Sequence, residues 1–482
     1  PSAFLSSMKS KSITRILTGF LFVILFWACN AQQNTAQATS APKITIDVAN
    51  TQPGTVFLIG SYADRRFRLD SAVITEGQAA VFQNNVPYPT GFYVAYYPDK
   101  TAVQFLLDSD QEFTIKTDKS DLIEAASVEG SKANELLYHS LKFETKQQVD
   151  FNAVNARIQS QTPGTPEYIA AQNEQKELSA QRKQFLNDLF TANPDNLFTS
   201  FKQAGQNPEL RTDLKLPDGK PDNDGQVKAY RDEFWDNVNF ADTSLIYTPV
   251  INNKLTRYIT QLTPQNAAAI IESADNLMKR VMNHPKYYQF FANWIVLKYE
   301  PGNTNLMDGE AVYVHMINNY FTKEKAIWTD SMTVYGLQQR AGEMAQSLTG
   351  QPGPNITVPD VNGNPKTLYD LKAPYLIVYM YNPTCEHCIE ETPKLVNFLR
   401  GRNDIEVFAV ALDTEVAPWK KFIQDFGIQN WTNVYDPSNR SIYKTYFVDH
   451  TPELYLLNPD RKIIGKNLKA GQIAEVINRD KQ

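Results

Sequence analysis

Two cysteines three residues apart carry the clearest sign of chemistry in this sequence. Cys385 and Cys388 follow an apolar run at 375–381 and open a segment with a helical pattern at 385–400. The first turn of a helix offers unpaired N–H groups and the positive end of the helix dipole, which stabilise a thiolate. We therefore expect Cys385 to attack a disulfide and Cys388, one turn deeper, to resolve the mixed disulfide that forms.

Two purely structural roles for the cysteine pair are alternatives to this interpretation. The cysteines could form an inert structural disulfide, or they could supply half of a zinc site. A structural zinc ion usually has four protein ligands. His450 with the two thiolates would provide only three, and the third cysteine, Cys29, stands near the start of the chain. The sequence therefore favours redox chemistry with no metal and no cofactor beyond a redox-active disulfide between Cys385 and Cys388.

The surroundings of the pair predict an α/β domain. Beyond a Gly- and Pro-rich linker at 350–354, extended and helical segments alternate: 375–381, 406–412 and 454–457 are extended, and 385–400, 416–426 and 472–479 are helical. Such alternation is typical of a parallel or mixed sheet with helices on its faces. In these sheets chemistry takes place where strands end and helices begin, which is where the cysteines lie.

Further motifs in residues 351–482 carry a resemblance to a known family. The run Asn382–Cys388 stands between strand and helix, Glu391 lies three residues after the second cysteine, and Thr451-Pro452 precedes a late strand. In these features the region resembles the TlpA/ResA class of thioredoxin-fold proteins, which are exported, membrane-tethered thiol-disulfide oxidoreductases. The resemblance implies that Pro452 is a cis-proline facing the cysteines and that Glu391 is the glutamate this class keeps near its active site.

The departures from the family pattern concern redox tuning. Tyr379 stands where classical thioredoxins have a buried acid, so the resemblance leaves Glu391 as the carboxylate for proton handling. The central dipeptide is Glu386-His387, which is neither the Gly-Pro of classical thioredoxins nor the Glu-Pro common in this class. We expect Glu386, His387 and Thr451 to tune the redox potential. The predicted activity is reduction of disulfides in exported proteins, supplied with electrons by a thiol donor.

Two other functions stay open. A related thioredoxin-fold family of thiol peroxidases places a threonine three residues before its reactive cysteine. That position is Asn382 here, and Thr384 is adjacent to the cysteine instead. The second alternative is a non-enzymatic surface lipoprotein, in which the N-terminal regions bind a partner and the thioredoxin fold is a scaffold.

Two more folded regions are expected ahead of this domain, so the fold is multidomain. Residues 43–130 alternate in short apolar runs, such as Phe92, Val94 and Tyr96, and predict a small antiparallel β-domain. Residues 131–349 follow a helical period and predict an α-helical domain, with one helix capped by Thr263. Both regions resemble domains of unknown function that precede thioredoxin modules in Bacteroidetes lipoproteins.

The start of the chain resembles a targeting signal. A basic stretch and 13 apolar residues precede Cys29, too few to span a bilayer, and the ending resembles a bacterial lipobox. We expect residues 1–29 to be a signal peptide with Cys29 lipidated, and residues 30–42 to be a flexible tether. This predicts a periplasmic or cell-surface protein anchored to a membrane, the outer membrane being favoured. Cleavage after Ala31 would instead give a secreted, soluble protein.

Length and charge are consistent with this organisation. The 482 residues leave room for about three domains. There are 47 basic and 53 acidic residues, a formal charge of −6. A chain without a basic excess gains little from counterion release, which argues against nucleic acid as a partner.

Overall fold

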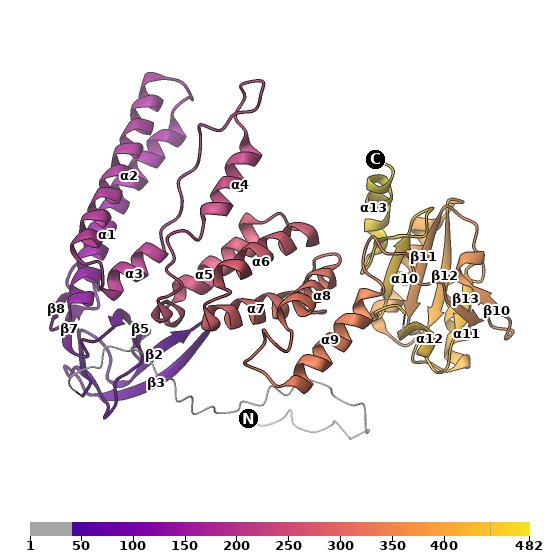
Figure 1. Ribbon diagram of the computed structural model, residues 1–482, viewed down its shortest axis with the longest axis horizontal. Helices are drawn as coiled ribbons and strands as arrows, with labels where there is room; N and C mark the ends of the chain where they lie inside the picture. Colours follow the sequence, from indigo (N-terminus) through magenta and orange to yellow (C-terminus); the bar gives the residue numbers. More distant parts are fainter. Residues whose placement is uncertain (1–40, 444) are drawn as a thin grey trace, which may run out of the picture.

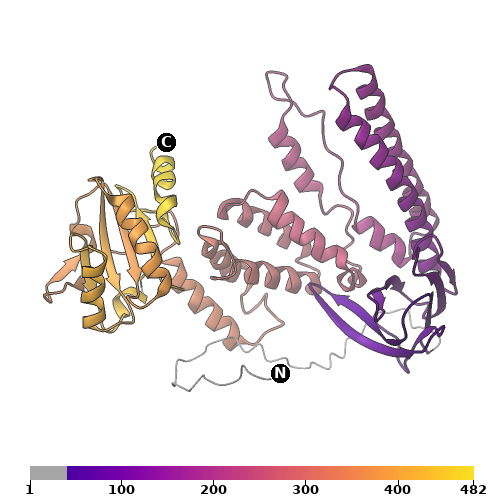
Figure 2. The ribbon, with the colours of Figure 1, turned by 180° about the vertical axis from the view of Figure 1, so that it is seen from behind.

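The computed structural model describes residues 41–443 and 445–482. A β-rich region and a C-terminal α/β domain lie at opposite ends of the molecule, with helices between them (Figures 1 and 2). The predicted signal peptide, Cys29 and residues 30–40 of the predicted tether lie outside the described residues. Within the part of the chain that is described, no helix is both long and apolar enough to cross a membrane.

The N-terminal region contains two four-stranded sheets, with the orders β4-β1-β7-β8 and β3-β2-β5-β6. Its strands are β1 (Lys43–Ala49), β2 (Gly54–Tyr62), β3 (Arg65–Ile74), β4 (Ala80–Gln83), β5 (Gly91–Tyr96), β6 (Ala102–Leu107), β7 (Glu112–Asp118) and β8 (Ser127–Glu129). The predicted antiparallel arrangement fails at one pair, because β1 and β7 run parallel, with Ile44 beside Phe113. The second sheet lies in the chain between these two strands, which gives the long crossover that a parallel pair needs.

The middle region is helical, as predicted. Its helices are α1 (Lys132–Ser160), α2 (Pro166–Ala192), α3 (Leu197–Ala204), α4 (Asn223–Glu233), α5 (Pro249–Arg257), α6 (Ala267–Val281), α7 (Pro285–Tyr299), α8 (Gly309–Tyr320) and α9 (Ser331–Ala345). Helices α1 and α2 form a long hairpin that starts at the β-rich region and projects away from it, and α9 leads into the C-terminal domain (Figure 1).

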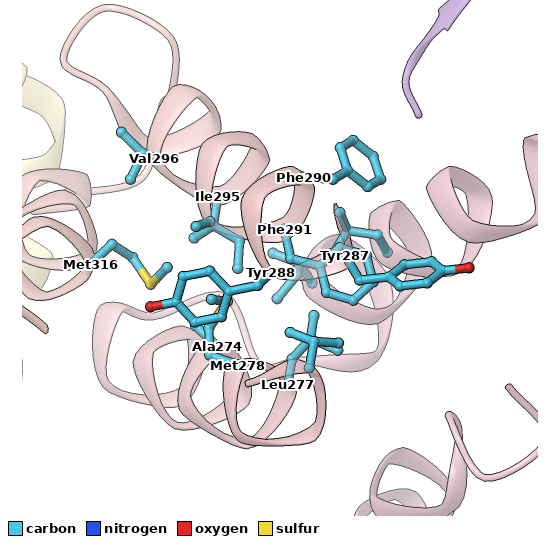
Figure 3. Packing of buried hydrophobic residues seen from close by; sticks show 14 of the residues in the cluster. Ala274, Leu277, Met278, Tyr287, Tyr288, Phe290, Phe291, Ile295, Val296 and Met316 are labelled. Carbon is cyan, nitrogen blue, oxygen red and sulfur yellow. The ribbon is translucent and has the colours of Figure 1, made fainter. Parts of the chain in front are cut away.

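The aromatic-rich helix α7 lies in the core of this region. Tyr288 and Phe291 of α7 pack with Leu277 and Met278 of α6 (Figure 3). These four side chains are between 0% and 7% exposed, so the stretch serves core packing. The start of α6 differs from the prediction: the side chain of Asn266, and not of Thr263, accepts the capping hydrogen bond.

In strand β5, the side chains that face the β core are not those of the alternating apolar residues Phe92, Val94 and Tyr96. Tyr93 is buried in the β core, whereas Tyr96 is 41% exposed and Val94 is only half-buried. Phe92 packs on the other side, stacked on Phe201 of α3 with ring centroids 5.6 Å apart. Apolar residues therefore occur on both faces of this strand, and alternation alone does not identify the inner one.

The C-terminal domain has a central five-stranded sheet in the order β13-β12-β11-β14-β15. Its elements are β9 (Thr357–Pro359), β10 (Pro365–Thr367), β11 (Tyr375–Tyr381), α10 (Glu386–Leu399), β12 (Ile405–Ala411), α11 (Val416–Asp425), β13 (Thr432–Tyr435), α12 (Arg440–Tyr443), β14 (Glu453–Leu457), β15 (Ile463–Gly465) and α13 (Ile473–Asp480). Strand β11 runs parallel to β12 and antiparallel to β14. All seven residues of β11 are buried, since helices or loops cover both faces of the sheet. The expected α/β sheet is thus present.

The predicted linker at 350–354 is attached to this domain. The N–H of Gly350 donates to the carbonyl of Ile463 at 2.7 Å, and the N–H of Gly353 donates to that of Arg461 at 2.8 Å. The stretch therefore extends the edge of the sheet beside β15.

Candidate functional site

Cys385 lies where the chain turns from strand β11 into helix α10. The turn is closed by a hydrogen bond from the N–H of Cys385 to the carbonyl of Asn382 at 3.1 Å. The side chain of Asn382 also accepts from the N–H of Thr384 at 2.8 Å. Cys385 is the N-cap residue of α10, so its side chain lies at the positive end of the helix, as the sequence predicted.

The surroundings of Cys385 favour its thiolate. Burial of the sulfur opposes ionisation, but the backbone N–H of Cys388 and the side chain of Thr451 outweigh it, with smaller help from the Cys388 side chain and the N–H of His387. These hydrogen bonds lower the pKa of Cys385 below its ordinary value. A half-buried cysteine with a lowered pKa has the properties of an attacking nucleophile.

Cys388 has the opposite environment. Its side chain is fully buried, and burial is the main reason why its pKa is raised to about 12. Cys385 adds to this rise, because a thiolate next to Cys388 disfavours a second negative charge. Both residues are free thiols. One thiol is therefore accessible and activated, and the other is protected and protonated.

The predicted cis-proline directly follows a residue that contacts Cys385. The peptide bond between Thr451 and Pro452 is cis, as the resemblance implied. The sulfur of Cys385 donates to the carbonyl of Thr451 at 3.3 Å, across 66 residues of chain. Thr451 thus contacts Cys385 through its carbonyl and through the side chain that favours the thiolate.

A short hydrogen-bonded chain lies beneath Cys388. The hydroxyl of Thr392 donates to the carbonyl of Cys388 at 2.7 Å. The hydroxyl of Tyr379, 2.8 Å from that of Thr392, is then the donor between the two. Burial raises the pKa of Tyr379 well above its ordinary value, so this residue stays neutral. Tyr379 fills the position of the classical buried acid without supplying a carboxylate.

Glu391 is attached to other parts of the domain. One carboxylate oxygen accepts from the N–H of Ala470 at 2.8 Å, and the other lies 3.0 Å from the ammonium of Lys394. Its side chain is 13% exposed. These contacts join α10 to the turn before α13, which is a structural task that the sequence does not predict. Proton handling by Glu391 stays a prediction.

The remaining predicted residues lie at the surface. Glu386 and His387, in the first turn of α10, are both exposed. His450 is exposed as well, next to Thr451. In the described parts of the chain no three residues of the types His, Cys, Asp and Glu are arranged to hold a metal ion.

One buried carboxylate beside the site was not anticipated. Glu453 follows Pro452 directly, is 1% exposed, and has a pKa raised well above the usual range by burial. Lys466 opposes this rise and is itself fully buried. The position of Glu453 after Pro452 could have identified it from the sequence. Nothing in the local pattern connects it with Lys466.

Comparison with protein families divides the chain as its architecture does. Residues 43–137 and 172–335 match two domains of unknown function, DUF4369 and DUF5106. Residues 349–466 match the AhpC/TSA family. This last match contains Cys385, Cys388 and Thr451-Pro452.

Individual relatives cover between about a quarter and just over half of this chain. The mitochondrial SCO2 homolog of Mus musculus is 25% identical over 171 residues, which cover 30% of this chain and 66% of that protein, just under two thirds of its length. A thioredoxin-like protein from Bacteroides caccae is 21% identical, over 57% of this chain and 98% of its own, with a TM-score of 0.45. The thioredoxin domain of a thiol-disulfide oxidoreductase from Bacteroides vulgatus is 27% identical, over 27% of this chain and 96% of its own, with a TM-score of 0.26.

Proposed function

We propose that this protein, whose C-terminal domain is a thioredoxin-like domain of the AhpC/TSA family, is a thiol-disulfide oxidoreductase that reduces disulfides in exported proteins. The observation that carries the proposal is the contrast between the two thiols. Cys385 is accessible with a lowered pKa, and Cys388 is buried with a raised one. That contrast suits one sulfur to attack and the other to resolve.

The reaction begins with the thiolate of Cys385. It attacks one sulfur of a substrate disulfide, so a bond forms between the two sulfurs while the substrate S–S bond breaks. The other substrate sulfur leaves as a thiolate and takes a proton from water. Thr451 supports this step, since its side chain stabilises the attacking anion.

Resolution uses the second cysteine. Cys388 loses its proton and attacks the sulfur of Cys385, which forms the intramolecular disulfide and releases the second substrate thiol. The substrate has gained two electrons, and the cysteine pair has lost them. A thiol donor must then reduce Cys385–Cys388 for another turnover. In our proposal Glu391 accepts the proton that leaves Cys388.

The proposed place of action is outside the cytoplasm. The basic and apolar stretch ahead of Cys29 supports export, and the lipobox-like ending supports a lipid anchor on that cysteine. Disulfide-bonded substrates are found in such oxidising compartments, which agrees with the proposed chemistry.

A paired assay tests the function. The full chain should reduce insulin disulfides with dithiothreitol as donor, and it should consume little hydrogen peroxide under the same conditions. Cys385→Ser should abolish insulin reduction. Peroxide consumption faster than insulin reduction would favour a thiol peroxidase, and no cysteine-dependent turnover of either would favour a binding lipoprotein.

A further inference from the structure

The helical region and the C-terminal domain share a buried group of charges, which we call the interdomain cluster. It consists of Asp308 and Glu310 at the start of α8, with Glu453 and Lys466 from the C-terminal domain, and each of these residues is 6% exposed or less. The ammonium of Lys466 lies 3.8 Å from Glu310 and 3.9 Å from Asp308. It also donates to the carbonyl of Ser347 at 3.2 Å.

One residue connects this cluster to the redox site by hydrogen bonds. The side-chain amide of Asn467 donates to Glu310 at 3.2 Å, and the backbone N–H of Asn467 donates to Glu453 at 3.0 Å. Glu453 is the residue after Pro452, and Thr451 contacts the sulfur of Cys385. A continuous path therefore runs from helix α8 to the nucleophile.

The helical region also holds the other end of the same loop. We define the cis-proline loop as residues 447–453. At its start, Phe447 packs against the helical core, and its N–H donates to the hydroxyl of Ser347 at 3.1 Å. In the middle, a Cβ on Gly302 would lie 3.4 Å from the carboxylate of Asp449. The loop that faces Cys385 is thus in contact with the helical region at its start, lies close to Gly302 in its middle, and is connected to Glu310 through Asn467 at its end.

We infer that Glu310 is a positioning residue for the redox site, through which the helical region holds the cis-proline loop against Cys385. The inference rests on the proposed function and adds a role for the middle region of the chain. Buried charged groups are costly to desolvate, so their use at this boundary is better explained by fixing a geometry than by adding stability.

Breaking the path should change the ionisation of Cys385. The Thr451 side chain helps to lower the pKa of Cys385, so a loop that is free to move away should raise it. Glu310→Ala removes the acceptor for Asn467 but leaves Lys466 paired with Asp308 at 3.9 Å and bonded to the carbonyl of Ser347, so the cation keeps partners. Asn467→Gly removes only the side-chain donor and suits the backbone, because Asn467 has a left-handed φ of 54°.

The experiment measures the rate of Cys385 alkylation against pH in the reduced full-length protein. In Glu310→Ala and Asn467→Gly we expect the midpoint to rise by about half a pH unit, and the rate near neutral pH to fall about threefold, since the rate follows the thiolate fraction. Glu310→Gln keeps an acceptor for Asn467 and should resemble the parent. The matched control is Glu144→Ala in the distant helix α1, which breaks the partly buried ion pairs of Glu144 with Lys202 and Arg182.

The outcomes separate this inference from the proposed function. A parent protein without a reactive thiolate at Cys385 would contradict the function itself. A normal parent profile that superimposes on those of Glu310→Ala and Asn467→Gly would contradict only the positioning role. An equal shift in Glu144→Ala, or a shift in Glu310→Gln as large as in Glu310→Ala, would likewise overturn the hydrogen-bonded path.

Discussion

Cys385 and Cys388 differ in access and in protonation, although they belong to one helical turn. Cys385 caps α10 and is half-buried, whereas Cys388 is fully enclosed and has a pKa of about 12. At neutral pH the thiolate fraction of Cys388 is therefore negligible until a partner removes its proton. The order of the two chemical steps that we propose rests on this difference.

The first prediction concerns covalent trapping. Cys388→Ser should accumulate mixed disulfides with exported proteins, because the attacking thiolate remains and the resolving thiol is gone. Cys385→Ser should form few or none, because Cys388 is buried and protonated. Non-reducing gels of both variants provide the measurement. Equal trapping by the two variants would contradict the assignment, and no adducts with either would favour an inert disulfide.

The second prediction concerns Glu391 and the pH dependence of resolution. If its carboxylate accepts the proton of Cys388, Glu391→Gln should slow disulfide exchange several-fold at neutral pH. The loss should shrink at higher pH, where hydroxide removes the proton. Glutamine still offers an acceptor to the N–H of Ala470, so the fold should persist. Profiles of rate against pH that superimpose on the parent's would assign Glu391 a purely structural role.

For single residues, the sequence predicts those properties that depend on residues nearby in the chain. The spacing of Cys385 and Cys388 and their place before a helix are local, and the pKa shift of Cys385 has the expected direction. The contact between Cys385 and Thr451 came from family resemblance. The electrostatic interaction of Lys466 with Glu453 depends on how distant segments pack, and no local pattern contains that information.

Among the elements, α1 is attached to the β-rich region more firmly than its place in the helical region suggests. Asn134 in the first turn is fully buried, and its side chain bonds both the N–H and the carbonyl of Leu106 in β6, at 2.7 and 2.8 Å. The hydroxyl of Tyr138 donates to the carbonyl of Gln104 at 3.0 Å. The start of α1 therefore provides hydrogen-bond partners for backbone groups at the edge strand β6.

The third prediction tests this attachment. Asn134→Ala leaves two buried backbone groups of Leu106 without their partner, and we expect it to lower the free energy of unfolding by about 2–3 kcal/mol. Asn152→Ala, on an exposed position of the same helix, should change it by less than about 0.5 kcal/mol. Urea unfolding followed by circular dichroism measures both. A small loss in Asn134→Ala would mean that water replaces the side chain there.

The errors of prediction at the scale of elements have a common origin. The alternation of Phe92, Val94 and Tyr96 identifies a strand, but it does not show that Phe92 packs on Phe201, on the second face of its sheet. The parallel pairing of β1 with β7 likewise depends on the order of strands in space. Periodicity in the sequence identifies a strand or helix and its apolar residues. It does not identify which other element packs against each face, because that depends on the tertiary structure.

The whole molecule is a series of three regions joined by buried contacts. At one junction Ala63, at the tip of the β2–β3 hairpin, lies in the helical core and donates its N–H to the carbonyl of Ile246 at 2.7 Å. At the other junction the interdomain cluster joins α8 to the cis-proline loop. The C-terminal domain with the cysteine pair is therefore held by the helical region, which is in turn joined to the β-rich region (Figure 1).

The final prediction concerns how this molecule is held in the cell. Lipidation of Cys29 would anchor it, and a tether at residues 30–42 would give it a root-mean-square reach of about 20 Å from the membrane surface. Labelled palmitate should be incorporated into the parent and into Cys385→Ser/Cys388→Ser, which keeps Cys29. Cys29→Ser should lose the label and move to the soluble fraction, because acyl chains supply the membrane affinity. Labelling that survives in Cys29→Ser would rule out Cys29 as the lipid attachment site, and a mature N-terminus at Gln32 would establish cleavage without a lipid anchor.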